Sequence, residues 1–377
     1  MNKIVLAIDS YKGCLSSLEV EEAAAAGIRS VFPETKVCCV PIADGGEGMM
    51  EVLVRLTGGE KVVVPVHDPL MRPVEACYGV LGDGVTAVVE MAQASGLPLL
   101  SISERNPSLT TTYGVGEILR EVLEAGYKKV IVGLGGSATN DAGMGMMQAL
   151  GAHFYDETGR ELSWGCGGLL GKVSKVVLDD FRQRIDGVAF RAACDVENEF
   201  CGPNGAAEVF APQKGADVSM VKSLDEGLIR FASVIVGETG VDVRRLSGAG
   251  AAGGLGGCLS AFFRAPLCSG IDLILEQIDF RRMSAGAALL VTGEGKADRQ
   301  TLMGKVPMGV LKVGKEMGVD VALLSGTVDD VGILRSAGFV EVMAATPKEL
   351  PLEQALVAEV AKRNVYHAAV ALAKMWL

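Results

Sequence analysis

Residues 130–152 read VIVGLGGSATNDAGMGMMQALGA, a stretch with the order strand, glycine-rich loop and helix. It begins with a short β-branched run, continues through a glycine-rich loop and ends in a helix of small and flexible residues. The loop packs Ser137, Thr139, Asn140 and Asp141 into five positions. A glycine-rich turn between a strand and a helix is typical of α/β proteins, where three kinds of site use it: a dinucleotide site, a serine nucleophile and a phosphate cradle.

The composition also favours an α/β protein of two domains. The chain has 377 residues, of which 49% are hydrophobic, 5% are aromatic and 49 residues are glycine. Single hydrophobic cores usually stop growing before this length, so two domains are expected. The many glycines fit tight strand-to-helix turns, and the content of Val, Ile and Leu argues against a disordered chain.

At both ends of the chain, β-branched runs alternate with segments of helical periodicity, which predicts a parallel sheet wrapped by helices. Ser16 and Glu19 form a capping box for a helix that runs to about Val31. Near the N-terminus we expect strands at 3–8, 37–42 and 61–66. Towards the C-terminus we expect strands at 288–291, 321–324 and 340–343, and helices from about Pro307, near Val331 and from about Leu352.

The segment 68–93 has a different pattern. Two strand-like runs are joined there by Gly82-Asp83-Gly84, a hairpin signal with no helix between the strands. Two parallel-sheet halves thus flank a mixed segment. The sequence therefore predicts a discontinuous parallel-sheet α/β domain, residues 1–66 and 285–377, with an inserted mixed α/β domain, residues 67–284.

Charge and cysteine content exclude several classes of partner. The formal net charge of −11 would repel nucleic acid and anionic membranes, so neither is an expected partner. The longest uncharged stretch, 246–263, holds six glycines and is too short for a membrane-spanning helix. The nine cysteines show no C-x-x-C spacing. We therefore expect a cytoplasmic protein with reduced thiols.

The two alternatives to a phosphate cradle, a dinucleotide site and a serine nucleophile site, each depart from the pattern that they require. Gly133, Gly135 and Ala138 match a dinucleotide fingerprint, but the acid that should close the next strand falls at Asp156, in a turn. For an α/β serine hydrolase with Ser137 as nucleophile, Thr139 crowds the last position of G-x-S-x-G. Such a hydrolase also needs a histidine, and the candidates are His67, His153 and His367. A tight turn with Asn140 or Asp141 as helix cap is the plain alternative.

Similar polar loops follow other predicted strands, at the edge where open α/β sheets bind ligands. They mix acids, lysines and glycines, and they lie at 9–13, 43–48, 195–198, 211–215 and 292–298, with Gly304 and Lys305 just beyond. Phosphoryl transfer needs this mixture: a divalent metal held by carboxylates, cations on the transferred group, and a carboxylate that accepts the hydroxyl proton.

Eight ordered motifs resemble the bacterial type-1 glycerate kinase family. They are AIDSYKG from Ala7, PIADGGEG from Pro41, GLGGSATNDAG from Gly133, ACDVEN from Ala193, APQKGA from Ala211, SGAGAAGGLG from Ser247, TGEGKAD from Thr292 and GKVPMGV from Gly304. The sequence departs from the family pattern in having Ile8 for Pro, Tyr11 for Phe and Ala142 for Gly. None of these departures removes a charged or hydroxyl group.

The resemblance implies a kinase that uses ATP and Mg²⁺ to convert D-glycerate to 2-phosphoglycerate in organic-acid or glyoxylate catabolism. It also implies a discontinuous flavodoxin-like (Rossmann-like) domain, an inserted α/β domain and an active site between them. A kinase of another small hydroxy acid remains an alternative. A homodimer is compatible with the sequence but is not indicated by any motif.

The predicted site residues fall into four groups. Catalytic candidates are Asp195, as general base or metal-linked carboxylate, with Lys12 and Lys214 near phosphate or the glycerate carboxylate. Nucleotide-binding candidates are Gly135, Gly136, Ser137, Thr139, Asn140, Gly293 and Lys305. Substrate-binding candidates are Asp9, Ser10, Asp44, Gly45, Gly46 and Glu47. Metal-binding candidates are Glu294 and Asp298.

Overall fold

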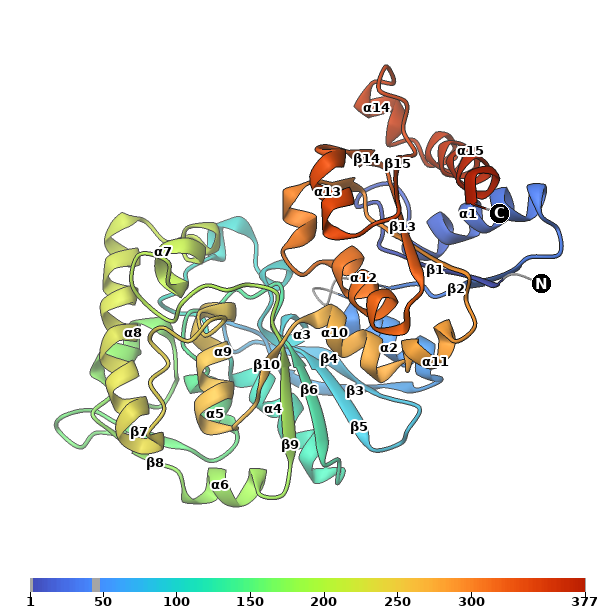
Figure 1. The fold of residues 1–377 in the computed structure, drawn as a ribbon. Helices are drawn as coiled ribbons and strands as arrows, with labels where there is room; N and C mark the ends of the chain where they lie inside the picture. Colours follow the sequence, from blue (N-terminus) through green and yellow to red (C-terminus); the bar gives the residue numbers. More distant parts are fainter. Residues whose placement is uncertain (1–2, 43–47, 377) are drawn as a thin grey trace. The chain divides into compact units, whose positions relative to one another are not determined.

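The structure is a computed structural model, and it describes residues 3–42 and 48–376. The chain divides into two compact units. Unit 1 comprises Met1–Asp44 and Ile271–Leu377, and unit 2 comprises Gly45–Gly270. The predicted Asp44, Gly45, Gly46 and Glu47 lie outside the described residues. Figure 1 shows the ribbon coloured along the sequence, with the ends of the chain, blue and orange to red, in unit 1.

Unit 1 is built on a five-stranded parallel sheet in the order β15-β13-β11-β1-β2. Its strands are β1 Lys3–Ile8, β2 Lys36–Cys39, β11 Leu289–Gly293, β13 Asp320–Ser325 and β15 Glu341–Ala344, with the short pair β12 Lys296–Ala297 and β14 Thr327–Val328. Counted within the unit, this order is 2-1-3-4-5, the flavodoxin-like order. The predicted fold class is thus confirmed, and the winding switches direction between β1 and β11.

Helices cover both faces of the unit 1 sheet (Figure 1), and its central strands β1, β11 and β13 are accordingly almost wholly buried. The helices are α1 Ser17–Val31, α10 Gly270–Gln277, α11 Phe280–Ser284, α12 Val306–Met317, α13 Val331–Ala337, α14 Leu352–Ala355 and α15 Ala358–Trp376, with the 3₁₀ helix η5 Arg299–Leu302. The predicted capping box of Ser16 and Glu19 is present at α1. Figure 1 shows α1 and α15 side by side, and a β-carbon at Gly27 would overlap the Tyr366 carbonyl.

Unit 2 carries a six-stranded mixed sheet in the order β10-β9-β6-β5-β4-β3. Its strands are β3 Glu60–His67, β4 Pro73–Val80, β5 Thr86–Glu90, β6 Lys129–Gly133, β9 Ala189–Ala193 and β10 Leu267–Cys268, and β7 His153–Tyr155 pairs separately with β8 Lys175–Val177. Strands β3, β4 and β5 are antiparallel, which includes the hairpin predicted at Gly82–Gly84. From β5 to β10 the strands are parallel, so the loops that follow β6 and β9 leave the same edge.

The helices of unit 2 pack around one large apolar core that includes Val132, Phe154 and Phe231. They are α2 Met49–Thr57, α3 Ala92–Ser95, α4 Tyr113–Glu124, α5 Met144–Ala149, α6 Asp179–Ile185, α7 Ala206–Phe210, α8 Val218–Thr239 and α9 Ala251–Phe262. The 3₁₀ helices are η1 Leu97–Leu99, η2 Ile102–Glu104, η3 Gly167–Lys172 and η4 Pro212–Lys214.

The domain boundaries drawn from the sequence differ from the units of the structure. The strand expected at 61–66 was assigned to the outer domain, but β3 pairs along its whole length with β4, from Glu60↔Val80 to His67↔Pro73. The segment 45–66 therefore belongs to unit 2, and 271–284 belongs to unit 1. Strand pairing, which periodicity does not reveal, sets these boundaries.

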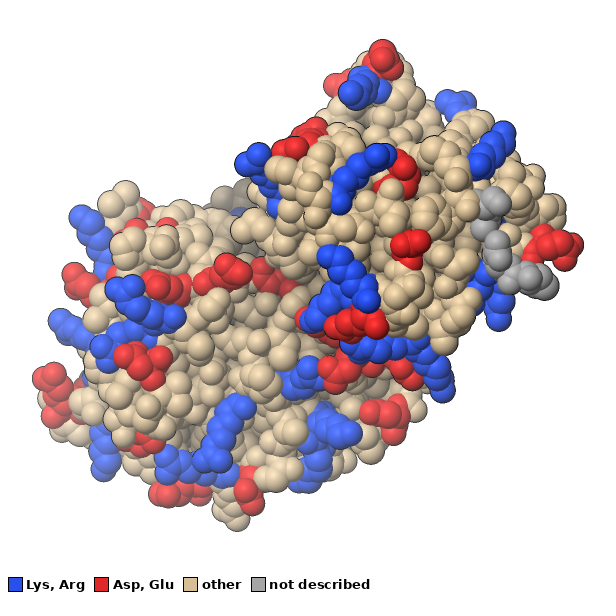
Figure 2. All heavy atoms as spheres, in the orientation of Figure 1, with Lys and Arg blue, Asp and Glu red and all other residues tan. Residues whose placement is uncertain are grey.

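One face of the molecule carries charges of both signs (Figure 2). On the face drawn in Figure 2, acidic and basic side chains are interspersed among uncharged residues. An anionic ligand of this acidic chain would therefore need a local set of cations or backbone amides. None of the helices in the described part of the chain is both long and apolar enough to cross a membrane.

Candidate active site

A cavity of about 390 Å³ opens in unit 1 at the carboxyl edge of its sheet. Its polar lining comes from the loops after β1 and β11, the two strands between which the winding switches. This lining includes Asp9, Ser10, Lys12, Glu294, Lys296 and Lys305. The opposite wall is apolar and contains Leu352, Ala355 and Leu356. We call this space the unit 1 cavity.

Glu294 is the centre of the polar network in the unit 1 cavity. It is only 7% exposed, and it accepts hydrogen bonds from Thr301 Oγ1 at 2.7 Å and from Lys305 Nζ at 2.9 Å. Asp9, also 7% exposed, follows the neighbouring strand and accepts a hydrogen bond from Ser10 N at 2.7 Å. Two buried carboxylates and three lysines therefore line one space.

Tyr11 and Asp298, from the same two loops, make different contacts. Tyr11, one of the departures from the family pattern, is buried and donates a hydrogen bond to Leu324 O at 3.4 Å. Burial raises the pKa of its phenol. Asp298 is the N-cap of η5, where it accepts from Gln300 N at 2.8 Å, and it is not part of the cavity lining. Thr301 links Asp298 to Glu294, its predicted metal-binding partner: Thr301 Oγ1 accepts from Asp298 N at 2.9 Å and donates to Glu294 Oε1 at 2.7 Å.

A second cavity, of about 200 Å³, lies within unit 2 at the carboxyl edge of the parallel strands. The loop after β6 contributes Gly135, Gly136 and Ser137, and the loop after β9 contributes Asp195. Lys214 from η4 completes the polar lining, and Leu97, Leu134 and Phe210 are among its apolar residues. We call this space the unit 2 cavity.

The loop after β6 is folded tightly on itself. Ser137 Oγ accepts a hydrogen bond from Thr139 N at 3.1 Å and lies 3.1 Å from Thr139 Oγ1. Gly136 has a φ of 74°, a conformation that suits glycine. Asn140 is fully buried, and neither of its side-chain amide atoms has a hydrogen-bond partner in the described structure. Of the predicted cradle residues, Gly135, Gly136 and Ser137 reach the cavity, whereas Thr139 and Asn140 lie behind it.

Lys214 is a buried lysine, 2% exposed, whose ammonium group points at this loop. Its Nζ donates to Thr139 O at 2.6 Å and lies 3.4 Å from Ser137 Oγ. Burial lowers the pKa of Lys214 to about 7, and the nearby charge of Asp141 partly opposes this shift. Lys214 is therefore poised between the charged and neutral forms near physiological pH.

Asp141 holds the loop in place. It is fully buried and accepts hydrogen bonds from Thr112 N and Thr112 Oγ1, both at 2.8 Å, and from Gly143 N and Gly145 N, both at 3.2 Å. Burial raises its pKa, although these hydrogen bonds work against the shift. Of Asn140 and Asp141, the two residues considered as caps, Asp141 accepts from Gly145 N in the first turn of α5, whose N-cap position is Gly143.

A run of left-handed backbone packs against the same loop. Ala252, Gly253 and Gly254 have φ values of 51°, 68° and 92°. A β-carbon at Gly253 would overlap Thr139 O, so only glycine fits there. Ala142, where the family pattern has glycine, also has a positive φ of 47° and donates its N–H to Gly253 O at 3.0 Å.

Asp195 presents an exposed carboxylate at the unit 2 cavity. Its Oδ1 accepts a hydrogen bond from Gly270 N at 2.8 Å, at the first residue of α10. This contact orients the carboxylate and also resembles a helix cap. Besides the general-base or metal-linked role predicted from the sequence, Asp195 thus also has a capping contact.

The structure thus gathers the predicted residues into two sites. Asp9, Ser10, Lys12, Glu294 and Lys305 line the unit 1 cavity, and Gly293 ends the adjacent strand. Gly135, Gly136, Ser137, Asp195 and Lys214 line the unit 2 cavity. The apolar walls, such as Leu356 and Phe210, were missed because single apolar side chains carry no chemical signature in a sequence. Asp141 was noticed only as a cap, since its burial beside Lys214 depends on the tertiary fold.

The carboxylates of the unit 1 cavity fit a magnesium ion. Mg²⁺ at phosphoryl-transfer sites is usually held by one or two carboxylates together with substrate phosphates. Asp9 and Glu294 follow paired strands, in register at Ile8↔Gly293, and both line the cavity. Within residues 3–42 and 48–376, no group of three or more His, Cys, Asp or Glu residues is arranged to hold a metal by itself.

The arrangement around Ser137 differs from a serine hydrolase triad. In the described residues the hydrogen bonds of Ser137 Oγ go to Thr139 and Lys214. His67 Nδ1 is 3.0 Å from Glu117, His153 Nδ1 is 2.6 Å from Glu161, and His367 packs edge-on against Tyr366. A serine beside a lysine of lowered pKa is a nucleophile–base pair among the described residues that line the cavity.

Comparison with known proteins gives one consistent result. Residues 4–377 match the model of the glycerate kinase family. The chain is 44% identical to the glycerate kinase of Bacillus subtilis (strain 168) over 354 residues, 94% of this chain and 92% of that protein. It is 42% identical to the glycerate 2-kinase of Escherichia coli (strain K12), covering 94% and 93%. A crystal structure assigned to glycerate kinase 2 of Salmonella typhimurium LT2 has a TM-score of 0.86 and 41% identity, covering 99% of this chain and 98% of that one.

Proposed function

Since the chain belongs to the glycerate kinase family, we propose that it uses ATP to phosphorylate the 2-hydroxyl group of D-glycerate, which yields 2-phosphoglycerate. The observation that carries the proposal is the joint placement of Asp195, Ser137 and Lys214 in one small cavity. An exposed carboxylate, a hydroxyl donor and a buried lysine are the groups that a small hydroxy acid needs as phosphoryl acceptor.

We assign the nucleotide to the unit 1 cavity. Its volume of about 390 Å³ falls in the usual range for sites of larger organic ligands, whereas the 200 Å³ of the unit 2 cavity falls below it. Flavodoxin-like sheets bind their nucleotide-sized ligands at the switch point, here between β1 and β11. Leu352 and Leu356 would cover the base, and Lys12, Lys296 and Lys305 would face the phosphates.

Magnesium belongs with the nucleotide in this proposal. Asp9 and Glu294 would hold the ion, and Asp298, which caps η5, is left out. When bound, Mg²⁺ neutralises charge on the transferring phosphoryl group. Glu294 also accepts a hydrogen bond from Lys305, so this carboxylate keeps the lysine in the cavity.

We assign D-glycerate to the unit 2 cavity. Lys214, when protonated, would attract the substrate carboxylate, and the Gly135–Ser137 backbone with the Ser137 hydroxyl would donate hydrogen bonds to it. Asp195 would accept the proton of the 2-hydroxyl group as that oxygen attacks the phosphoryl group. This assignment moves the Gly135–Asn140 loop from the nucleotide, where the motifs placed it, to the acceptor.

The cellular setting follows from the same chemistry. A kinase that acts on free D-glycerate serves the breakdown of small organic acids, such as the glyoxylate-derived ones. All nine cysteines are unpaired, which suits the reducing cytoplasm.

A coupled assay of ADP release tests the proposal. The purified protein, with ATP and Mg²⁺, is offered D-glycerate, L-glycerate, lactate and tartronate, and the product is identified by NMR. We expect turnover with D-glycerate and phosphorus on the 2-oxygen. Turnover with another hydroxy acid alone would change the proposed substrate. A 3-phosphate product would change the proposed position of phosphoryl transfer. No ADP release with any of the acids would refute the kinase assignment.

A further inference from the structure

The segment 95–105 contacts the residues around the unit 2 cavity at two places. At its start, Leu97 N donates to Gly136 O at 2.9 Å, and Ser95 O accepts from Ala138 N at 2.9 Å. Leu97 itself lines the cavity. At its end, the Arg105 carbonyl lies so close to Gly215, next to Lys214, that a β-carbon at Gly215 would overlap it. A shift of this segment would therefore move both sides of the acceptor site.

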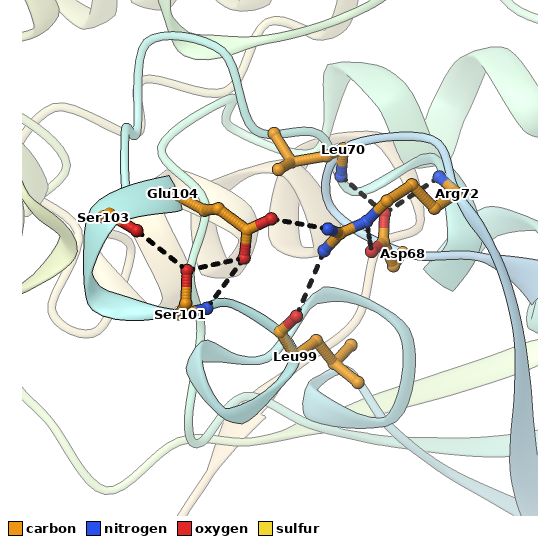
Figure 3. A network of polar contacts seen from close by, with 7 residues as sticks. All are labelled: Asp68, Leu70, Arg72, Leu99, Ser101, Ser103 and Glu104. Atoms are coloured by element: carbon orange, nitrogen blue, oxygen red, sulfur yellow. Dashed lines mark hydrogen bonds and ion pairs between the residues drawn. The ribbon is translucent and has the colours of Figure 1, made fainter.

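Arg72 ties this segment to the sheet. As Figure 3 shows, its guanidinium group reaches three acceptors on two different parts of the chain. Nε donates to Asp68 Oδ2 at 2.6 Å, in the same turn. The two terminal nitrogens donate to Glu104 Oε1 at 2.6 Å and to Leu99 O at 3.3 Å, both within the segment 95–105.

Both ends of this connection are fixed. Asp68 is 5% exposed and accepts backbone hydrogen bonds from Leu70 N at 2.8 Å and Arg72 N at 2.9 Å, in the turn that joins β3 to β4. Met71 in this turn has a φ of 63°, which is uncommon for a residue other than glycine. Glu104 is in turn held by Ser101 N at 2.9 Å and Ser101 Oγ at 2.8 Å. The guanidinium thus bridges two carboxylates that are each held by further hydrogen bonds.

We propose that Arg72 is a positioning residue of the kinase: by clamping segment 95–105 to the β3–β4 turn, it keeps the Gly136–Ser137 loop in the shape that binds the acceptor. This inference rests on the proposed function of the unit 2 cavity. Arginine suits the task because its planar fork of donors can satisfy three acceptors in a fixed geometry. A lysine ammonium on a flexible stem holds such a geometry less well.

The clamp acts on function more than on folding. The Arg72 side chain is about half exposed, at 46%, so its removal leaves no cavity in the core. Asp68 keeps its two backbone donors when the guanidinium is lost. The protein should therefore fold without the clamp, with a looser acceptor loop.

Arg72→Gln tests this directly. We expect the KM for D-glycerate to rise about tenfold, and the KM for ATP to stay within about twofold of the wild-type value. Hydrogen exchange at the Leu97 and Ala138 amides should accelerate several-fold, because these two N–H groups bond across the interface with the loop. Arg72→Lys should recover only part of the glycerate affinity, and Glu104→Gln should fall between wild type and Arg72→Gln.

Arg184→Gln is the matched control, since it removes another ion pair of unit 2, with Glu124 at 3.9 Å, from residues that do not line the cavity. It should leave both KM values and both amides unchanged. The inference would be overturned if Arg72→Gln kept the KM for glycerate and the amide exchange rates of the wild type. Equal rises in the KM for ATP and the KM for glycerate would overturn it too. If the wild-type protein does not act on glycerate, the proposed function fails, and the amide exchange still decides whether the clamp exists.

Discussion

The two cavities of this protein, which we propose to bind anionic substrates, place their lysines in different surroundings. The unit 1 cavity is larger and pairs aliphatic residues with lysines whose side chains are at least partly exposed, such as Lys12 and Lys305. The unit 2 cavity is half the size and uses one lysine that is 2% exposed, supported by a buried aspartate. Exposed cations attract a highly charged ligand at little cost in desolvation. A buried cation costs more free energy but discriminates more strongly, because its partner must replace water fully.

This difference suits the two substrates that we propose for the cavities. A nucleotide brings several negative charges and an apolar base, and many contacts can share its binding. Glycerate is small, so each contact carries a larger share of the binding free energy. We therefore expect single substitutions in the unit 2 cavity to have the larger effects on catalysis.

The largest effect is expected at Asp195. Asp195→Asn keeps the shape of the side chain, and the amide oxygen can still accept from Gly270 N, so melting temperature should hardly change. The charge that accepts the hydroxyl proton is lost, and kcat should fall about a hundredfold or more. Steady-state kinetics and thermal melts on the same preparation measure both. A variant with full activity would show that Asp195 only caps α10.

A smaller loss with a pH signature is expected at Lys214. Lys214→Met keeps the length of the buried side chain and removes its charge, so glycerate KM should rise about 30-fold. Because burial lowers the pKa of Lys214 to about 7, the wild-type KM for glycerate should rise about fivefold between pH 7 and pH 8, as the ammonium loses its proton. The variant should lose this dependence.

Lys305→Met, in the unit 1 cavity, is the control for Lys214→Met. It should raise the KM for ATP and keep the wild-type pH dependence of the KM for glycerate.

The pH dependence of the free energy of unfolding gives a second check on Lys214, because the sign of its slope is fixed. In the unfolded chain Lys214 binds its proton up to its ordinary pKa of 10.5, but in the folded chain only up to about 7. The wild type should therefore gain stability relative to Lys214→Met as pH rises from 7 towards 10. A slope of the opposite sign would show that the folded lysine stays charged.

The smallest of the three effects is expected at Ser137. If its hydroxyl is one donor among several, Ser137→Ala should lower kcat/KM by only about tenfold, the loss of about 1.4 kcal/mol of hydrogen bonding. A Ser137–Lys214 nucleophile pair would predict complete loss of activity instead. Labelling by a fluorophosphonate probe, blocked in the alanine variant, would support the nucleophile and weaken the contrast between the two cavities.

Much of the fold could be predicted from the sequence because it depends on local patterns. The strand β1 and the helix α1 with its capping box lie where periodicity and Ser16 place them. The domain boundary near β3 was wrong because the pattern of a strand does not specify its pairing partner, and β3 pairs with β4.

The sites were predictable in part for the same reason. Motifs located Glu294 and Lys214, since charged residues in glycine-rich loops stand out in a sequence. They did not reveal that Lys214 is buried against Thr139, that Asp298 caps η5, or that Arg72 is bonded to Glu104 in the segment 95–105. Each of these facts depends on contacts between residues far apart along the chain.

We propose that the nucleotide binds in unit 1 and glycerate in unit 2, and one calorimetric experiment tests this assignment of the two cavities. Binding of a non-hydrolysable ATP analogue with Mg²⁺, and of D-glycerate, is measured on wild type, Leu356→Glu and Lys214→Met. Leu356 is 45% exposed on the wall of the unit 1 cavity, so a glutamate there should fold normally and repel the nucleotide. We predict that Leu356→Glu weakens the analogue about tenfold or more and spares glycerate, and that Lys214→Met does the reverse. Loss of analogue binding in Lys214→Met, with normal binding in Leu356→Glu, would contradict the account.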